Sequence, residues 1–351
     1  NSRFILLSYP SFLKKVVLDL VWPQEVRVQG MFFNKRRQFQ KFFNRVSAIF
    51  VRVLVILQRQ YKRPIKLVLS SIVDYAPDYP WIAAAKNQKT KAAVLNKESI
   101  ICFPDDKEKI ISWFRGNKFF YEGDAVFFYN NFSKDLFVEA GVVEENSAFL
   151  VGCPRVDTLL ALSKEIKNNG SFIILASFMM FSYGALRLWG SVIDAVYGDK
   201  LLKEKTIIKC RNDGEVSELR VKYPDITIVS GPLENYLRKS PAALVGFNST
   251  SCLDALVSGI PVVVPWWEEA QDFKDAFWLV GPHSKNFHFL AENPKELVNI
   301  LTELLKKPVP YKFNYLPGLK EFLVQRYSPV DGKNCERVFK AVEDLLYVKK
   351  D

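Results

Sequence analysis

Residues 231–265 read GPLENYLRKSPAALVGFNSTSCLDALVSGIPVVVP, and this stretch decides the fold class. Its apolar run Ala242–Val245 is short and bounded by turn residues, as is typical of a buried parallel strand. After a polar turn, the apolar residues of Leu253–Val257 continue as a helix, which Gly259 ends before a second apolar strand at Pro261–Val264. The stretch therefore predicts a strand–helix–strand unit of an α/β protein.

The polar turn between the first strand and the helix is a candidate anion site. It contains four consecutive residues with hydrogen-bonding side chains, Asn248, Ser249, Thr250 and Ser251. A helix N-terminus offers free N–H groups and the positive end of its dipole, and ligands of parallel sheets bind beyond the carboxyl edge. We therefore expect a nucleotide phosphate here. Because Ser251-x-x-Asp254 is also a capping pattern, a purely structural cap is the alternative.

Length and composition limit the classes of protein to consider. A chain of 351 residues has room for two domains of about 150 residues each. Its five cysteines are widely spaced, without a C-x-x-C pair, which favours reduced thiols in the cytoplasm. With His283 and His288 as the only histidines, histidine triads and multi-histidine metal sites are disfavoured, and we expect no metal. No apolar run reaches the ~20 residues of a membrane span.

The net charge of +11 is consistent with nucleic acid, an anionic membrane or small anionic substrates as partners. One basic cluster lies among the phenylalanines of residues 32–50 and consists of Lys35, Arg36, Arg37, Lys41, Arg45 and Arg52. A helix over residues 35–52 of this composition can lie on an anionic membrane, which would place the protein on the inner face of the cytoplasmic membrane. The alternative is a helix with one core face and one solvated basic face. No nucleic-acid-binding motif is recognisable, so we expect no nucleic acid partner.

Strand and helix patterns alternate along the first half, which predicts a mainly parallel sheet with right-handed crossovers. The predicted strands are Phe4–Ser8, Glu25–Val28, Ile65–Ser70, Lys91–Leu95, Ala125–Phe128 and Ala148–Val151. The predicted helices are Ser11–Leu20, Gln38–Gln58, Tyr79–Asn87 and Ser133–Ala140.

The polar segment Ser163–Gly170 is the best linker signal, and the same alternation begins again after it. Besides the two strands above, the second half contains predicted strands at Phe172–Ser177, Thr206–Lys209 and Ile226–Val229. The predicted helices are Ala185–Val196, Glu215–Lys222, Leu233–Lys239, Ser251–Val257, one capped by Asn293 that runs to Lys306, and Asn334–Val348. We expect an N-terminal domain at 1–165, a second domain at 166–330 and a terminal helix within 331–351.

The Asn248-Ser249-Thr250 turn, Asp254 and the G-I-P-V-V-V-P run of 259–265 resemble the donor-binding segment of GT-B glycosyltransferases, particularly bacterial capsule and lipopolysaccharide enzymes. In that family an acidic residue follows the turn and contacts the ribose; here it is Asp rather than the more usual Glu. The resemblance implies two Rossmann-like domains facing a cleft. It also implies that the terminal helix crosses back to the N-terminal domain.

Further candidates follow the strands of the second half. Lys209, Arg211 and Asp213 lie on the same predicted sheet edge as the polar turn, and two cations beside a carboxylate suit an anionic sugar donor. Family members often have K-x-H-P here, which this chain lacks. In the alternative, Asn212-Asp213-Gly214 only reverses the chain. The loop containing Gly231 and Leu233 resembles the one whose backbone recognises the base.

The first half adds its own candidates. Glu98 ends the run Val94–Glu98 at an expected carboxyl edge, and the residues G-C-P-R-V-D at 152–157 resemble the "TG-PR-D" element of capsule and polyol-phosphate transferases. Arg155 and Asp157 of that element either face the cleft or form a structural ion pair with each other. Asp74 and Ser177, each next to a predicted strand end, are further candidates for the cleft.

The sub-family that the chain resembles best is the retaining transferases of 3-deoxy-manno-octulosonic acid (Kdo). This resemblance implies CMP-Kdo as co-substrate, no other cofactor, and a bacterial surface glycan or glycolipid as acceptor. It also implies a carboxylate nucleophile, for which we select Asp213, with Glu98 as acid/base. A nucleotide-sugar 2-epimerase, a polyol-phosphate transferase, a UDP-sugar-dependent transferase and a non-catalytic scaffold are the alternatives. The shortage of histidine counts against the first two.

Overall fold

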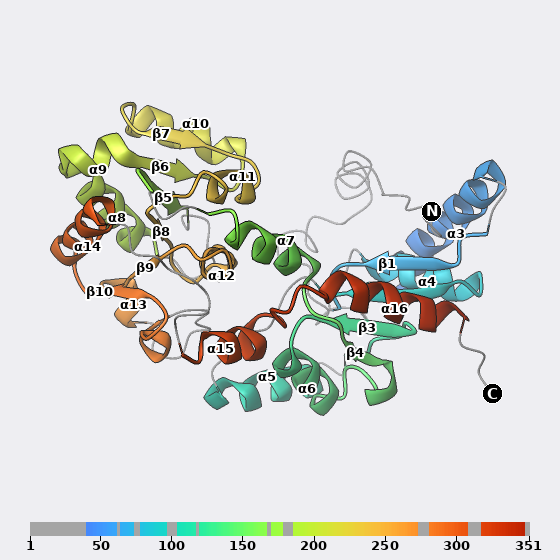
Figure 1. The fold of residues 1–351 in the computed structure, drawn as a ribbon. Helices are drawn as coiled ribbons and strands as arrows, with labels where there is room; N and C mark the ends of the chain where they lie inside the picture. Colours follow the sequence, from blue (N-terminus) through green and yellow to red (C-terminus); the bar gives the residue numbers. More distant parts are fainter. Residues whose placement is uncertain are drawn as a thin grey trace.

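The computed structural model of the chain describes residues 40–61, 64–73, 78–96, 104–116, 119–166, 170–177, 185–272, 281–307 and 317–347. Within them the protein consists of two lobes, each built on an all-parallel sheet with helices around it (Figure 1). The predicted α/β class is therefore confirmed. The strands predicted at 4–8 and 25–28 and the helix predicted at 11–20 lie outside the described residues.

Among the described residues, the first sheet has four strands in the order β1-β2-β3-β4, so each of these strands pairs with its successor. The strands are β1 (Leu67–Ser70), β2 (Lys91–Leu95), β3 (Ala125–Phe128) and β4 (Ala148–Leu150). The helices of this region are α3 (Gln40–Tyr61), α4 (Tyr79–Asn87), α5 (Pro104–Gly116), α6 (Asn131–Glu139) and the 3-10 turn Glu145–Ser147. The bounds of β2, β3 and α4 are the predicted ones.

Side-chain alternation along these strands divides the first lobe into two buried layers. Val126 and Phe128 pack with apolar residues of α4, α5 and α6 on one face of the sheet. Ala125 and Phe127 point to the other face, where they meet the apolar side of α16 (Asn334–Tyr347). The last helix of the chain therefore covers the first sheet, as Figure 1 also shows in red.

The second sheet has six strands in the order β10-β9-β8-β5-β6-β7. They are β5 (Ile173–Ala176), β6 (Thr206–Lys209), β7 (Thr227–Val229), β8 (Ala243–Val245), β9 (Val262–Pro265) and β10 (Phe289–Ala291). The chain adds strands on one side of β5 and then returns to add them on the other side. The strand order therefore reverses between β5 and β8, which makes that position the switch point of the sheet.

Helices cover both faces of the second sheet, because right-handed crossovers built in opposite directions fall on opposite faces. On one side α8, α9 and α14 contact one another, and on the other α7 contacts α12 (Figure 1). The helices are α7 (Pro154–Ser163), α8 (Leu186–Gly198), α9 (Lys200–Lys205), α10 (Asp213–Lys222), α11 (Glu234–Leu237), α12 (Thr250–Val257), α13 (Glu269–Asp272), the 3-10 turn Pro282–Ser284, α14 (Pro294–Lys306) and α15 (Leu319–Arg326).

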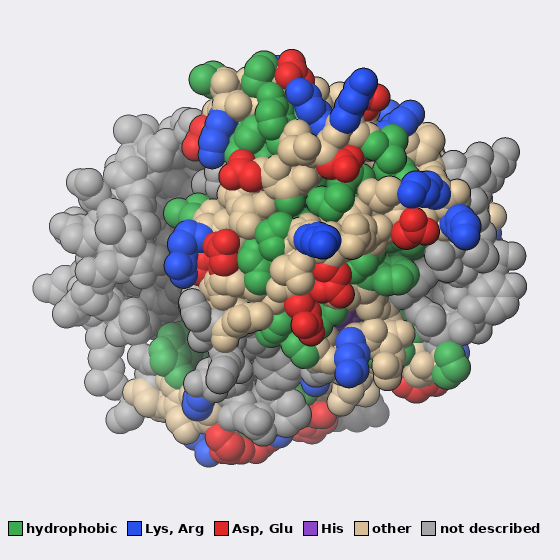
Figure 2. All heavy atoms as spheres, turned by 90° about the vertical axis from the view of Figure 1, so that its left-hand side faces the viewer, with side chains coloured by type: hydrophobic (Ala, Val, Ile, Leu, Met, Phe, Trp, Pro, Cys, Tyr) green, Lys and Arg blue, Asp and Glu red, His purple; other side chains and the backbone are tan. Residues whose placement is uncertain are grey.

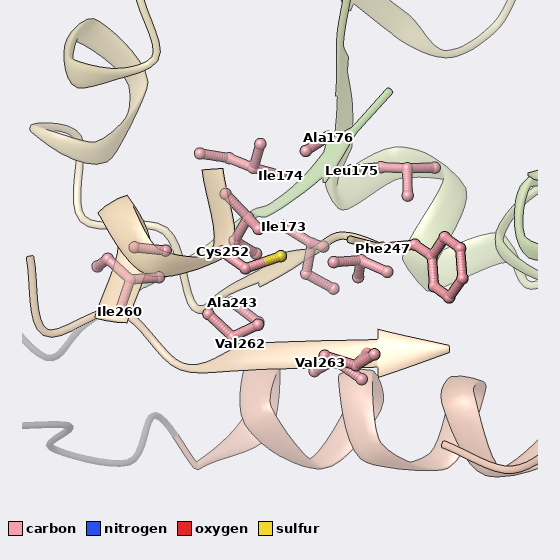
Figure 3. Packing of buried hydrophobic residues seen from close by; sticks show 14 of the residues in the cluster. Ile173, Ile174, Leu175, Ala176, Ala243, Phe247, Cys252, Ile260, Val262 and Val263 are labelled. Carbon is pink, nitrogen blue, oxygen red and sulfur yellow. The ribbon is translucent and has the colours of Figure 1, made fainter. Parts of the chain in front are cut away.

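The core of the second lobe lies on both sides of β5, whose residues Ile173, Ile174 and Leu175 are fully buried. Figure 3 shows these side chains with those of β8 and β9 and with Cys252 from α12. A strand buried on both faces is apolar at successive positions, and this pattern is what predicted β5 from the sequence.

Helix α7 precedes the predicted boundary at residue 165, yet its apolar side belongs to the second core. Val156, Leu159 and Leu162 are buried there with the strands of the second sheet. The division at 165 stays a prediction, and the chain changes from one core to the other near Cys153.

One face of the second lobe carries interspersed charges (Figure 2). On the face shown in Figure 2, lysine and arginine side chains alternate with acidic ones and do not gather in one patch. Of the helices within the described part of the chain, none has both the length and the apolar character to cross a membrane.

Gly246, in the turn after β8, is predicted to be required for the close approach of α12. A Cβ at this position would stand 2.7 Å from Cys252 Sγ and 3.2 Å from Leu244 Cδ2. We expect Gly246→Ala to lower the free energy of unfolding by about 1–3 kcal/mol through overpacking. In a Cys252→Ala background, where the sulfur is absent, the same substitution should cost clearly less. Urea unfolding of the four proteins measures this coupling, and equal costs in both backgrounds would contradict it.

Candidate functional site

The carboxyl ends of β5, β6 and β8 bring together several of the predicted donor-binding residues. Ser177, just after β5, donates its N–H to the carbonyl oxygen of Lys209 at the end of β6 (2.9 Å). The hydroxyl oxygen of Ser177 is buried and has no hydrogen-bond partner among the described residues. On the other side of β5, the turn after β8 leads through Asn248 into α12.

Local chemistry explains why α12 begins at Thr250. Asn248 has a φ of 42°, a left-handed conformation that asparagine tolerates better than most residues. Ser249 then caps the helix: its hydroxyl accepts from the N–H of Ser251 (3.2 Å) and donates to the Ser251 hydroxyl oxygen (3.1 Å). The predicted turn is therefore both a cap and a polar helix start, and these two interpretations are compatible.

Helix α12 differs from its neighbours in having no acidic side chain at its start. The first turns of α10, α11 and α14 contain acidic residues, respectively Asp213 with Glu215, Glu234, and Glu296. The start of α8 is filled by Glu269, whose carboxylate accepts from the N–H groups of Arg187 (2.9 Å) and Leu188 (2.8 Å). The first turn of α12 contains no acidic residue. Among these five helices, its N-terminus is thus the one best suited to an anion.

Lys209 supplies a cation beside this position. Its side chain is half-buried at the end of β6 and makes no hydrogen bond or ion pair with the part of the chain that the structure describes. Burial lowers the pKa of its ammonium group, an effect opposed by the nearby carboxylates of Glu215 and Glu234. A half-buried ammonium group without a hydrogen-bonded counter-ion favours binding of an anionic ligand.

Asp213 begins α10 rather than a chain reversal. Asn212 caps the helix by accepting from the N–H of Glu215 (3.0 Å), so residues 212–214 form a helix start, and a catalytic role of Asp213 stays a prediction. Asp213 itself is exposed, and its Oδ1 accepts a hydrogen bond from the Ser230 hydroxyl (2.5 Å). Arg211 is also exposed, and its N–H donates to Glu215 Oε2 (3.0 Å).

The loop after β7 offers backbone rather than side chains. Gly231 has a φ of 105°, which favours glycine, and space is open beside it. The side chain of Leu233 is buried in the second core, so only its backbone can face a ligand. Tyr236 secures this loop by donating its hydroxyl to the carbonyl oxygen of Ser230 (2.8 Å).

Asp254 lies in a polar cluster with buried Tyr327, which follows α15, and with exposed Arg155 of α7. Its Oδ1 accepts from the hydroxyl of Tyr327 (2.6 Å) and lies 3.3 Å from Arg155 Nη2, which also donates to the Tyr327 hydroxyl oxygen (2.9 Å). Asp254 is only 3% exposed. Burial raises the pKa of its carboxyl group to about 6, against the opposing effects of Arg155 and Tyr327. Its contact with a ribose stays a prediction, and one of its oxygens already has protein partners.

The alternative in which Arg155 and Asp157 pair with each other is wrong. Arg155 pairs with Asp254, whereas Asp157 holds the start of α16. The carboxylate of Asp157 accepts from the N–H groups of Asn334 (3.1 Å) and Cys335 (2.8 Å) and from the Asn334 side-chain amide (2.8 Å). An acidic side chain at a helix N-terminus is a stabilising arrangement.

Two of the predicted residues, Glu98 and Asp74, lie outside the described residues. His288 is described, and its ring contacts backbone oxygens: Nε2 lies 3.0 Å from the carbonyl oxygen of Gly281 and Nδ1 3.2 Å from that of Phe289. Burial lowers the pKa of His288. Among the described residues, no group of three or more acidic, cysteine or histidine side chains is placed to hold a metal ion.

Sequence reasoning missed Tyr327, Gly246 and Glu269. Tyr327 is 73 residues from Asp254 along the chain, and no local pattern marks this contact. Gly246 had a signal, since a glycine between a buried strand and a helix start indicates close packing.

Solved structures with the same arrangement are known. A Listeria monocytogenes protein assigned as a UDP-N-acetylglucosamine 2-epimerase superimposes with a TM-score of 0.53 at 14% identity, covering 89% of this chain and 81% of that one. A histidine variant of the wall teichoic acid polymerase TagF gives 0.53 at 13% identity, covering 81% and 74%. A second histidine variant of TagF gives 0.52 at 14% identity, covering 83% and 75%.

No protein-family model matches the chain, and no curated protein matches it by sequence. At these identities the structural similarity concerns the fold alone. The chain has the GT-B fold, with two Rossmann-like domains, as the resemblance implied.

The raised pKa of Asp254 predicts a pH dependence of stability. The unfolded chain releases this proton near pH 3.8 and the folded protein near pH 6, so the folded state holds it more tightly. The stabilising contribution is complete below about pH 4 and is lost as the pH rises through 6. We expect wild type to lose up to about 3 kcal/mol relative to Asp254→Asn between pH 4 and 7.

Urea unfolding of wild type and Asp254→Asn at pH 4, 5, 6 and 7 measures this difference. Asparagine keeps an oxygen that accepts from Tyr327 but does not titrate. A difference in unfolding free energy that is constant over this range, or that changes in favour of wild type, would show that Arg155 keeps the carboxyl ionised.

Proposed function

We propose that this protein is a glycosyltransferase that binds a nucleotide-activated sugar at the switch point of its second sheet. The observation that carries the proposal is the convergence there of Lys209, without a hydrogen-bonded counter-ion, and the start of α12, which lacks an acidic first turn. Their neighbours on the same sheet edge include the backbone loop at Gly231. The GT-B fold supports the proposal, because both Rossmann-like domains are present.

In this proposal the phosphate binds between α12 and β6. Backbone N–H groups at the helix start donate to the phosphate oxygens, and the Lys209 ammonium group contributes a charged hydrogen bond. Arg211, exposed on the same edge, approaches a second anionic group of the donor. The loop at Gly231 and Leu233 reads the base through its backbone.

We further propose a cytidine nucleotide, with CMP-Kdo as donor and a surface glycan or glycolipid as acceptor. What supports this finer assignment is the sequence resemblance, together with the two cations that suit the carboxylate of such a sugar. Asp213 and Glu98 are proposed as nucleophile and acid/base. The Asp213 carboxylate attacks the anomeric carbon and releases the nucleotide; the acceptor hydroxyl then displaces Asp213 while Glu98 takes its proton.

Two other activities, those of a nucleotide-sugar 2-epimerase and of a polyol-phosphate transferase, are the alternatives to a glycosyltransferase. The structural similarity to a protein assigned as a 2-epimerase and to a teichoic acid polymerase favours them as second candidates. The shortage of histidine counts against both activities. Of the two histidines, His288 contacts backbone oxygens with both ring nitrogens. Proton NMR of UDP-N-acetylglucosamine incubated with the protein alone tests the epimerase; inversion at sugar C2 would replace the transferase proposal.

Lys209→Met is expected to weaken nucleotide binding about tenfold or more, as the loss of a hydrogen bond to a charged group costs about 1.5–3 kcal/mol. Calorimetry with CMP, CDP, UDP and GDP at equal low salt measures the affinities. The matched control is Lys205→Met, because Lys205 precedes the same strand at its other end and is exposed. Unchanged affinity in Lys209→Met would remove the site, and tighter UDP than CMP binding would remove the cytidine assignment.

We also propose that α3 rests on an anionic membrane surface, which would bring the protein to a glycolipid acceptor. Its inner side is held by Phe50, whose ring stacks on Trp81 of α4 at 4.1 Å. Ile49 and Ile56 are 51% and 60% exposed, and their spacing of seven residues places them on one face of the helix. Arg52 and Arg59 are exposed on the same helix, a combination typical of interfacial helices. The basic residues Lys35, Arg36 and Arg37 lie outside the described residues, and the side chains of Lys41 and Arg45 are not described.

Flotation with vesicles tests this surface. We expect binding to vesicles that contain phosphatidylglycerol, little binding to neutral phosphatidylcholine, and loss of at least half of the bound fraction in the variant Arg52→Glu with Arg59→Glu. Lys200→Glu with Lys205→Glu, two exposed positions of the second lobe, is the matched control. Equal binding of both variants would show that α3 is only a solvated helix.

A further inference from the structure

The segment that links α15 to α16, residues 326–334, contacts both lobes. We call it the strap. Before it, Leu319 and Leu323 of α15 are buried in the second core; after it, α16 covers the first sheet. The strap therefore bridges the two cores, and its contacts bear on how the two lobes are held relative to each other.

On the side of the first lobe, the strap is held by Asn130. This residue follows β3, is fully buried, and caps α6 by accepting from the Ser133 N–H (2.7 Å). Its side-chain amide nitrogen lies within hydrogen-bonding distance of the carbonyl oxygens of Arg326 (3.3 Å) and Tyr327 (3.4 Å). The backbone at Tyr327 is thereby tied to the carboxyl end of the first sheet.

Where the chain passes between the lobes, the strap is held again. The hydroxyl oxygen of Ser328, which is fully buried, accepts from the N–H of Cys153 at the start of α7 (2.8 Å). The close approach of Asn334 requires glycine at position 152, because a Cβ there would lie 1.9 Å from Asn334 Oδ1. The strap and the start of α7 thus form one packed unit.

On the side of the second lobe, the strap contacts α12 through the side chain of Tyr327. The hydroxyl of Tyr327 donates to Asp254 in α12, while Arg155 from α7 donates to the same hydroxyl oxygen. Tyr327 is 2% exposed and Asp254 is similarly buried. Asp254 lies four residues after Thr250, one helical turn from the proposed phosphate site.

We propose that Tyr327 is a positioning residue that fixes the start of α12, and with it the donor phosphate, relative to the first lobe. The inference rests on the proposed function, and it assigns a role in donor binding to a residue that does not touch the donor. Tyr327 acts through Asp254. The groups that face this carboxylate are Arg155 from α7, Lys209 from β6 and Glu234 from α11.

Tyr327→Phe removes the hydroxyl and keeps the ring that fills the core. We expect the dissociation constant of the tightest-binding nucleotide to rise about three- to tenfold. In an Asp254→Ala background the same substitution should have no further effect, because the hydroxyl has lost its acceptor. Tyr197→Phe is the control, since the Tyr197 hydroxyl contacts Asp225 on the outer surface of the second lobe.

A residue that only stabilises the fold would lower the melting temperature and give additive effects on affinity; additivity overturns the proposal. If Asp254→Ala does not fold, hydrogen exchange of Tyr327→Phe decides: faster exchange confined to the start of α12 and the strap supports the proposal, and a uniform increase overturns it. Wild type that binds none of the four nucleotides overturns the proposed function as well. If wild type binds a nucleotide and Tyr327→Phe binds it with the same affinity, only this inference is overturned.

Discussion

The pairing of β8 with β5 is the constraint on which the rest of the site depends. Because β8 returns to the centre of the sheet, the polar turn at its end faces the ends of β5 and β6 instead of an outer edge. Lys209 and the start of α12 then flank the same strand. Strands in simple sequential order, as in the described part of the first sheet, create no such position.

The distribution of acidic side chains determines which helix start at this edge of the sheet is best suited to an anion. Carboxylates occupy or flank the starts of α8, α10, α11 and α14, where a negative charge stabilises the helix dipole. Those of Glu269, Glu215 and Glu296 also accept hydrogen bonds from backbone N–H groups. Helix α12 is capped by hydroxyl groups instead. A neutral cap stabilises the helix without repelling an anion, so the same residues serve folding and ligand binding.

The sequence predicted those features that depend on neighbouring residues. Doubly buried strands and the Asn293-Pro294 helix start are local patterns, and the structure confirms them. The cap of α12 is Ser249, two residues before the Ser251 that the capping pattern indicated. Strand β10 was missed because three apolar residues carry too little periodicity. Helix α7 was missed although Val156, Leu159 and Leu162 recur on one side of its ten residues. The Asp254–Tyr327–Arg155 cluster was out of reach, since Tyr327 meets residues 73 and 172 positions away.

We propose that a nucleotide phosphate binds at the start of α12, beside β5. A crystal structure of the protein soaked with the nucleotide that binds most tightly tests it directly. We expect phosphate oxygens within hydrogen-bonding distance of backbone N–H groups at Ser249–Ser251 and of Lys209 Nζ, with the base at the loop of Gly231. A nucleotide bound at the first sheet, or at the start of α8 in place of Glu269, would contradict it.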